Sequence, residues 1–344
     1  MPDESTDMPP HEPEEPSQYE HILPLQNNRQ LHYASAGDPT STTVVLFFAG
    51  YFSIGTATPS SIPNALPGSH FIAPTIPGNG QSSSTPRNIP YNINLCESMT
   101  ALLEELHPSD NSKSNAISQL YIGGGSYGTV PAQMIYGAPY TLSPYGRKIA
   151  GLLLAAPFSP FRYHKDYTKS LIWPNWVSVG PPTQWLPFQI VQRLLSTFMA
   201  SRCKDLEGAR SLLDMAIFSK MDDAEKAQLE AWAQRKQGIT ADEFKTRTAE
   251  GALKCTANWG GFLEGPHVLH SDWGFEPAKL DEEHAKPVLV TLSEAEELGQ
   301  GMGEWLVENY RNAVLKKIQG GHIAALYHWD ELWEDLVQRS SITQ

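Results

Sequence analysis

Cysteine is scarce in this chain of 344 residues, and its three cysteines, Cys96, Cys203 and Cys255, lie far apart in the sequence. An odd, scattered set does not supply the disulfide framework that holds small secreted domains together. No two of them have the Cys-x-x-Cys spacing that is typical of zinc sites. We therefore expect free thiols, a reducing compartment and a cytoplasmic protein without a structural metal.

Long apolar runs are missing as well. No segment approaches the roughly 18 consecutive apolar residues that a membrane-spanning helix needs. The first residues contain neither the basic segment nor the apolar segment of a secretory signal. We expect no membrane partner and no export.

Positive charge is in short supply, because 25 Lys and Arg face 38 Asp and Glu and leave a formal net charge of −13. A nucleic-acid partner would require a basic patch, so this balance argues against one. Seven of the acids lie in residues 1–20, which contain no Lys or Arg and are rich in proline. We expect that segment to be a disordered acidic tail.

The rest of the chain has the composition of a globular protein, with 40% hydrophobic and 18% charged residues overall. A strand hairpin is predicted around Asn27-Asn28, and short apolar strands then alternate with helical segments. This alternation predicts an α/β fold with a mostly parallel sheet and helices on both faces. Further strands are expected at residues 42–50, 70–80, 119–125, 149–157, 286–292 and 313–319, and helices at 94–108, 127–137, 303–312 and 328–338.

A largely helical segment interrupts this alternation. We expect residues 21–157 and 286–344 to form the core, and residues 158–285 to form an inserted cap. The charged run at 222–236, "DDAEKAQLEAWAQRK", predicts a helix face in contact with solvent.

A serine between glycines marks the first candidate for catalysis. Ser126 lies in "YIGGGSYGTV", between a predicted strand and a predicted helix. A tight turn at this place forces a strained backbone on the serine, and side chains at Gly124 and Gly128 would collide with neighbouring backbone. The alternative is a glycine-rich connection without chemistry. A nucleophilic role therefore needs a base, an acid and an oxyanion hole elsewhere in the chain.

A histidine and an acid follow two later strands, in the order that such a serine requires. His322 stands in "IQGGHIAAL", just past the last strand, and is the candidate base. Glu296, in "SEAEEL" after the strand at 286–292, is the candidate that would orient its imidazole. Glu294 and Glu297 are the alternatives if the loop is shifted, and all three could instead belong to a solvated acidic loop.

Two backbone amides are expected to form the oxyanion hole. One is the N–H of Tyr127, the residue after the nucleophile, and the other comes from the loop after "VVLFFAG". Tyr51 would supply it, or Phe52 if the loop is shifted by one residue.

Four motifs together resemble the α/β-hydrolase family with a helical cap, especially its proline iminopeptidase, esterase and lactonase branches. They are "VVLFFAGY", "FIAPTIPGNGQSS", "GGSYGT" and "PVLVTLSEAEEL…IQGGHIAAL", and they span nearly the whole chain beyond the tail. The chain departs from the family pattern at Ala49-Gly50, where the family usually has His-Gly, and at Thr75, where it usually has Asp. The resemblance implies a serine nucleophile rather than the aspartate of the epoxide-hydrolase and dehalogenase branches.

Tryptophans are frequent in the expected cap. Trp173, Trp176 and Trp185 lie close together in "LIWPNWVSVGPPTQW", so we expect them, with Phe52, to line a pocket for a bulky apolar or aromatic substrate. The alternative is that these indoles pack the cap onto the core.

The sequence thus predicts a serine hydrolase of small molecules that uses Ser126, His322 and Glu296 and needs no cofactor or metal. The bond would be an ester, lactone or thioester, with an amide as the next option. A lyase, a cyclase or a carbon–carbon bond hydrolase of secondary metabolism on the same fold is one rival, and a non-catalytic ligand-binding protein is another. Monomer and homodimer remain equally open.

Overall fold

The computed structural model describes residues 18–108, 115–295 and 300–343. Its centre is an eight-stranded sheet with the strand order β1-β2-β4-β3-β5-β6-β7-β8. The pairs β1–β2 and β2–β4 are antiparallel, and the remaining pairs are parallel. The strands are β1 (Glu20–Leu25), β2 (Arg29–Gly37), β3 (Thr43–Phe48), β4 (His70–Pro74), β5 (Gln119–Gly125), β6 (Ile149–Ala155), β7 (Val288–Ser293) and β8 (Ala313–Ile318).

The sheet confirms the predicted α/β architecture. Asn27 and Asn28 form the hairpin turn with positive φ values of 60° and 56°, a conformation that asparagine adopts more readily than most residues. The apolar run at 42–50 forms a central strand that is covered on both faces, as its lack of alternation predicts.

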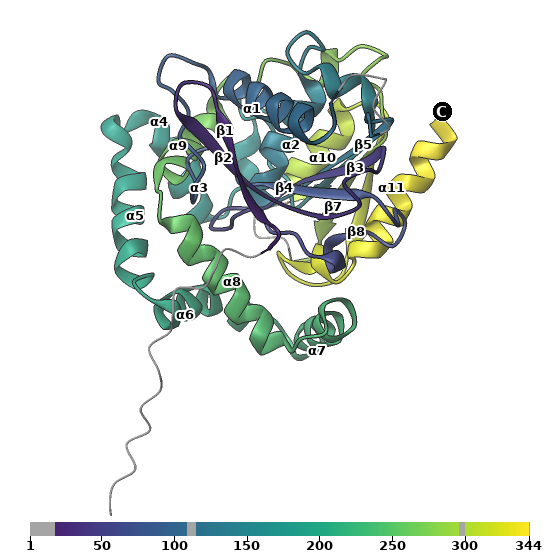
Figure 1. Cartoon of the computed structure of the whole chain (residues 1–344). Coiled ribbons are helices and arrows are strands. Elements are labelled where there is room, and N and C mark those ends of the chain that lie inside the picture. Colours follow the sequence, from purple (N-terminus) through teal and green to yellow (C-terminus); the bar gives the residue numbers. More distant parts are fainter. Residues whose placement is uncertain (1–17, 109–114, 296–299, 344) are drawn as a thin grey trace, which may run out of the picture.

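Alternate residues of the central strands enter two different cores. On β3, Val44 and Leu46 pack into the larger core, whereas Val45 packs into the core on the opposite face. Helices α1 (Tyr91–Leu106), α2 (Thr129–Gly137) and α10 (Gln300–Asn309) cover the first face, and α11 (Trp329–Thr343) covers the second. Figure 1 shows α11 on the outside of the sheet, at the opposite side of the molecule from α5.

Seven α-helices of the described chain lie between β6 and β7, where the sequence predicts the cap. They are α3 (Trp173–Val179), α4 (Pro182–Trp185), α5 (Ile190–Arg202), α6 (Leu206–Ala216), α7 (Asp223–Trp232), α8 (Ala241–Thr256) and α9 (Gly260–His270). We call these helices and their connections the cap. The exact boundaries 158 and 285 stay a prediction.

The cap is tied to the core at several points. Around α7 it has its own small apolar cluster, which packs against Ile323, Leu326 and Tyr327 just after β8. Lys236 pairs with Asp330 at the start of α11, with 2.8 Å between Nζ and Oδ1. In the described part of the chain, no helix is long and apolar enough to cross a membrane.

Candidate active site

Ser126 follows directly after β5 and has a left-handed backbone conformation, with φ of +52°. An L-residue other than glycine rarely adopts this conformation, and strain of this kind is found mainly where function requires it. The chain then makes a single 3₁₀ turn and continues into α2. The Thr129 hydroxyl donates to the Ser126 carbonyl at 2.6 Å and holds this turn closed. The side chain of Ser126 is half-buried at the carboxyl end of the sheet.

Close backbone approaches explain the glycines around this serine. A Cβ at Gly124 would lie 2.3 Å from the carbonyl oxygen of Gly128. A Cβ at Gly128 would lie 2.1 Å from the carbonyl oxygen of Phe48, at the end of β3. Both distances are far below van der Waals contact, so only glycine allows β3, β5 and α2 to meet this closely.

His322 lies beside the serine, as the sequence order predicts. Its Nε2 is 3.1 Å from the Ser126 Oγ, although the two residues are 196 positions apart in the chain. The loop that carries His322 leaves β8 through Gly320, whose φ of +110° suits glycine. This contact has the geometry that a nucleophile and its general base require.

The loop of the candidate acid runs next to the histidine loop. The Glu294 N–H donates to the Ile318 carbonyl at 3.0 Å, and the Ala295 N–H donates to the Gly320 carbonyl at 3.3 Å. Glu294 itself is exposed. Glu296 and Glu297 lie outside the described residues, so the choice of Glu296 stays a prediction.

The loop after β3 covers the serine from the other side. A Cβ at Gly50 would lie 3.2 Å from the Ser126 Cβ, and the ring centroids of Tyr51 and Tyr127 are 4.1 Å apart. The structure thus brings together the two residues whose amides are expected to bind an oxyanion, and their role as donors stays a prediction. Phe52 has a positive φ of 58°, which marks a sharp turn of this loop.

Thr75, where the family pattern has Asp, holds the same loop in place. Its hydroxyl accepts a hydrogen bond from the Gly55 N–H at 2.8 Å and contacts the His32 Nδ1 at 2.8 Å. Thr75 is buried, so these contacts satisfy a hydroxyl that would otherwise be costly to remove from water.

A cap carboxylate reaches the histidine loop, and the sequence analysis missed it. Glu225 on α7 is 8% exposed. Its Oε1 accepts from the Gly321 N–H at 2.7 Å and from the Tyr327 hydroxyl at 2.5 Å. Burial, together with the Glu225 carboxylate, raises the pKa of Tyr327, which therefore remains a neutral donor. Glu225 ties the cap to the residue that precedes His322.

The expectation that the run at 222–236 is a solvated face is wrong at Glu225 and at Lys236, whose side chain is 11% exposed. The exposed neighbours Asp223 and Lys226 follow the prediction, but Glu225 points toward the core. Helical spacing indicates that Glu225 is buried, because Leu229 lies four residues further on and belongs to the buried face of the same helix.

The predicted pocket residues fall into two separate groups. Phe52 forms ring contacts with Tyr51, Trp259 and Phe262, at centroid distances of 6.0, 6.3 and 5.3 Å. The cavity that these rings line has a volume of only about 10 Å³. This is about the space of one water molecule, and neither Ser126 nor His322 lines the cavity.

The three tryptophans that were predicted with Phe52 contact one another instead. Trp176 lies 5.4 Å from Trp173 and 6.2 Å from Trp185, measured between ring centroids. Trp173 and Trp185 are 72% and 71% exposed. Within the described residues, no ring contact joins this group to Phe52, and a pocket role for the tryptophans stays a prediction.

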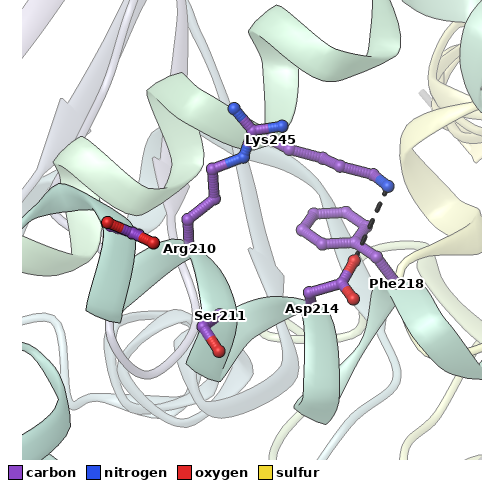
Figure 2. Close-up of a pocket in the computed structure, with 6 residues that line it drawn as sticks. Arg210, Ser211, Asp214, Phe218 and Lys245 are labelled. Atoms are coloured by element: carbon purple, nitrogen blue, oxygen red, sulfur yellow. Dashed lines mark ion pairs between the residues drawn. The ribbon is translucent and has the colours of Figure 1, made fainter.

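A larger cavity of about 300 Å³ lies elsewhere in the cap, between α6 and α8. Figure 2 shows Arg210, Asp214 and Lys245 along its wall. Lys245 pairs with Asp214 at 3.7 Å, and Arg210 pairs with Asp242. These charges neutralise one another, and neither Ser126 nor His322 lines the cavity, so it is separate from the candidate active site.

Cysteine nucleophiles and metal-binding clusters are weaker candidates for catalysis than Ser126. Burial raises the pKa of both Cys96 and Cys255 to about 12, which keeps these thiols protonated and weakly nucleophilic. Among residues 18–108, 115–295 and 300–343, no group of three or more His, Cys, Asp or Glu side chains is placed to hold a metal ion.

Comparisons with solved structures agree with this architecture. An α/β-hydrolase enzyme from a Medee basin deep-sea metagenome library has a TM-score of 0.52 and 17% identity, and the match covers 94% of this chain and 98% of that one. The chain has the α/β-hydrolase fold. An esterase from Exiguobacterium antarcticum has a TM-score of 0.57 and 13% identity, with 93% and 98% of the two chains covered.

A putative aryl esterase from Burkholderia cenocepacia gives a TM-score of 0.55 at 14% identity, with 94% of this chain and 100% of that chain covered. No protein-family model and no curated protein sequence matches the chain. At these identities the structural neighbours establish the α/β-hydrolase fold, and the activity has to be argued from the site.

A matched pair of glycine substitutions tests whether the α/β-hydrolase fold depends on the close packing at Ser126. Gly128→Ala should lower the free energy of unfolding by about 1–3 kcal/mol, because the new methyl group overlaps the Phe48 carbonyl. Gly251→Ala should raise it by about 0.5–1 kcal/mol, because Gly251 lies inside α8 and a Cβ there meets open space. Urea denaturation of both variants measures these changes. Equal effects of the two substitutions would contradict the packing argument.

The Glu225 contact predicts a graded loss of stability. Glu225→Ala leaves the Gly321 N–H and the Tyr327 hydroxyl without their acceptor, and should lower the free energy of unfolding by about 1–3 kcal/mol. Glu225→Gln keeps one carbonyl oxygen and should lose less. Gln228→Ala, at an exposed position of the same helix, is the control. Hydrogen exchange of the Gly321 amide should become faster in Glu225→Ala, and an unchanged rate would show that the contact does not hold this loop.

Proposed function

We propose that the protein is a serine hydrolase that cleaves an ester, lactone or thioester of a bulky apolar or aromatic small molecule. The observation that carries the proposal is the 3.1 Å contact between the His322 Nε2 and the Ser126 Oγ, at a serine with a strained backbone. An amide is the next candidate for the bond.

The chemistry would begin with proton transfer. His322 takes the proton of the Ser126 hydroxyl while the Oγ attacks the substrate carbonyl. The tetrahedral oxygen that results carries negative charge, and the backbone N–H groups of Tyr51 and Tyr127 are our candidates to bind it. His322 then gives its proton to the leaving group, and an ester of Ser126 remains.

Water completes the cycle. His322 takes a proton from a water molecule while the water oxygen attacks the acyl carbon of the Ser126 ester. The bond to Oγ then breaks, the carboxylic acid leaves, and His322 returns the proton to the Ser126 Oγ. Glu296 would hold the imidazole in the tautomer that presents Nε2 to the serine. The hydrogen bonds from residues 294 and 295 to the histidine loop support this assignment, since they bring the chain before Glu296 close to His322.

The rings beside the serine support the substrate class. Tyr51 and Phe52 belong to the loop beside Ser126, and the cap rings of Phe262 and Trp259 contact them to form an apolar wall. Such a wall favours an acyl or alcohol group with a large apolar surface.

A fluorophosphonate probe tests the nucleophile directly. We expect one covalent adduct on Ser126, located by mass spectrometry, because only an activated serine reacts with such a probe at a useful rate. Labelling should disappear in Ser126→Ala and in His322→Ala, while His328→Ala, at a histidine whose ring contacts Glu331 instead, should still be labelled.

Ester hydrolysis should fall by roughly 10⁴-fold in Ser126→Ala. A folded protein that neither reacts with the probe nor cleaves any ester, lactone or thioester would contradict the proposal.

Three glutamate-to-glutamine variants identify the acid. Glu296→Gln should lower kcat by up to about 10⁴-fold, because an amide favours the wrong tautomer of the histidine. Glu294→Gln and Glu297→Gln are matched controls from the same loop and should retain nearly full activity. Steady-state kinetics on one reactive ester measures all three. A large loss in Glu297→Gln alone would move the role to that residue.

A further inference from the structure

Helix α5 turns its apolar face toward solvent. Ile190, Leu194 and Phe198 follow one another at intervals of four residues and therefore lie on one face of the helix. They are 40%, 67% and 48% exposed. Gln192 points inward instead, with 2% exposure, and donates to the Ser178 carbonyl at 3.0 Å. A surface helix of a globular protein normally has the opposite arrangement, so this face requires an explanation.

The turn before α5 presents further apolar side chains. Phe188 is 83% exposed, and Trp185 and Leu186 are 71% and 45% exposed. Phe188 and Gln189 both have positive φ values, 57° and 54°, which are unfavourable for residues with large side chains. Trp173 joins this surface through the ring contacts of Trp176. We call Trp173, Trp185, Leu186, Phe188, Leu194 and Phe198 the aromatic patch.

The charge of the segment that carries the aromatic patch is opposite in sign to the net charge of the protein. Residues 167–204 contain four Lys and Arg and no Asp or Glu, in a chain whose net charge is −13. Two of these cations lie at the patch. The Arg193 Nε donates to the Phe188 carbonyl at 2.9 Å, and the Arg202 guanidinium lies 5.5 Å from the centre of the Phe198 ring.

The positive charges at the patch are not neutralised by ion pairs with described carboxylates. Among the side chains that the structure describes, no carboxylate forms an ion pair with Arg193, Arg202 or the neighbouring Lys204. Other cations of the cap, such as Lys245 and Lys236, do have acidic partners. The patch thus combines exposed aromatic rings with unneutralised positive charge.

We propose that the aromatic patch docks onto the surface of an anionic lipid bilayer. Tryptophan is enriched at the boundary between headgroups and acyl chains, where an apolar face of a helix can be buried. Anionic headgroups attract Arg and Lys that lie within about one Debye length, so Arg193 and Arg202 at the patch count more than acids on the far side of the protein. Docking at the bilayer surface needs no membrane-spanning segment, so the proposal departs from the expectation of no membrane partner, which rested on the lack of a long apolar run.

A second copy of the chain fits the aromatic patch less well. In a two-fold symmetric contact each patch would meet itself, which brings Arg193 and Arg202 of one copy toward the same residues of the other. Like charges that face each other across an interface oppose association. Residues 167–204 offer no acid to compensate them.

The position of the aromatic patch relates it to the candidate active site. Helices α3, α4 and α5 all contact α9, and Phe262 on α9 lies 5.9 Å from Tyr51, measured between ring centroids. Figure 1 shows α4 and α5 at the outer edge of the molecule. Docking would therefore place the lipid next to the helices that contact α9, whose Phe262 packs against Tyr51 in the loop beside Ser126. The docking itself does not depend on the proposed reaction.

Cosedimentation of the full chain with lipid vesicles tests the proposal. We expect the protein to bind vesicles of phosphatidylcholine mixed with phosphatidylglycerol, and to bind pure phosphatidylcholine vesicles more weakly. Trp185→Ser/Phe188→Ser/Leu194→Ser should lower the partition coefficient on the mixed vesicles by at least roughly 100-fold, because each apolar side chain loses its burial in the boundary. Ile22→Ser/Ile342→Ser, at two exposed apolar positions outside the cap, should bind like the unmodified protein.

A charge variant separates the two contributions. Arg193→Gln/Arg202→Gln should weaken binding to the mixed vesicles by about five-fold for each cation removed, and should leave binding to phosphatidylcholine nearly unchanged. Thermal unfolding of every variant checks that the fold is kept, which we expect because the replaced side chains are exposed.

Two results would overturn the proposal. The first is mixed-vesicle binding that is absent, or that is equal in the patch variant and the unmodified protein. The second is a concentration-dependent dimer in sedimentation velocity that the patch variant loses, with no binding to vesicles. In that case the occupant of the aromatic patch is a second copy of this chain.

Discussion

Parallel pairing of the strands β3, β5, β6, β7 and β8 places all of their carboxyl ends at one edge of the sheet. The loop with Tyr51, the turn with Ser126, the chain before Glu296 and the loop with His322 all begin at that edge. Residues that are nearly 200 positions apart thus come within hydrogen-bond distance. Because β3 approaches Gly128 closely, the turn at Ser126 is tight and the serine adopts a strained backbone conformation. In this conformation its hydroxyl points toward the histidine.

The cap has two ends with different physical roles. At α7 the cap is attached to the core. The buried Glu225 carboxylate accepts from the Gly321 N–H next to His322, and Lys236 pairs with Asp330 on α11. At α3, α4 and α5 it carries exposed aromatic rings and positive charge. One end therefore holds the candidate base in place, while the other faces outward and is available to contact an apolar, anionic surface. Helix α9 contacts α3, α4 and α5, and its Phe262 packs against Tyr51 in the loop beside Ser126.

Much of the fold could be predicted because local sequence patterns report on local burial. The run "TTVVLFFAG" predicts a strand that is covered on both faces, and Val44 and Val45 enter opposite cores as that requires. The positions of Ser126 and His322 at strand ends were predictable for the same reason. The contact of Glu225 was not, since its spacing from Leu229 places it on the buried face of the helix but does not show which group it meets there. Trp173 and Trp185 were expected at a pocket, and composition alone cannot tell an enclosed ring from an exposed one.

The sequence by itself determined the alternation of strands and helices, the glycines that a strained serine requires, and the chain order of serine, acid and histidine. These features depend on side-chain size, backbone freedom and apolar spacing, which act over a few residues. The tertiary structure decided which groups meet: the contact of His322 with Ser126, the reach of Glu225 to Gly321, and the outward face of α5. Contacts between distant segments depend on how the strands pair and on how the cap packs against the sheet, and no local pattern contains that information.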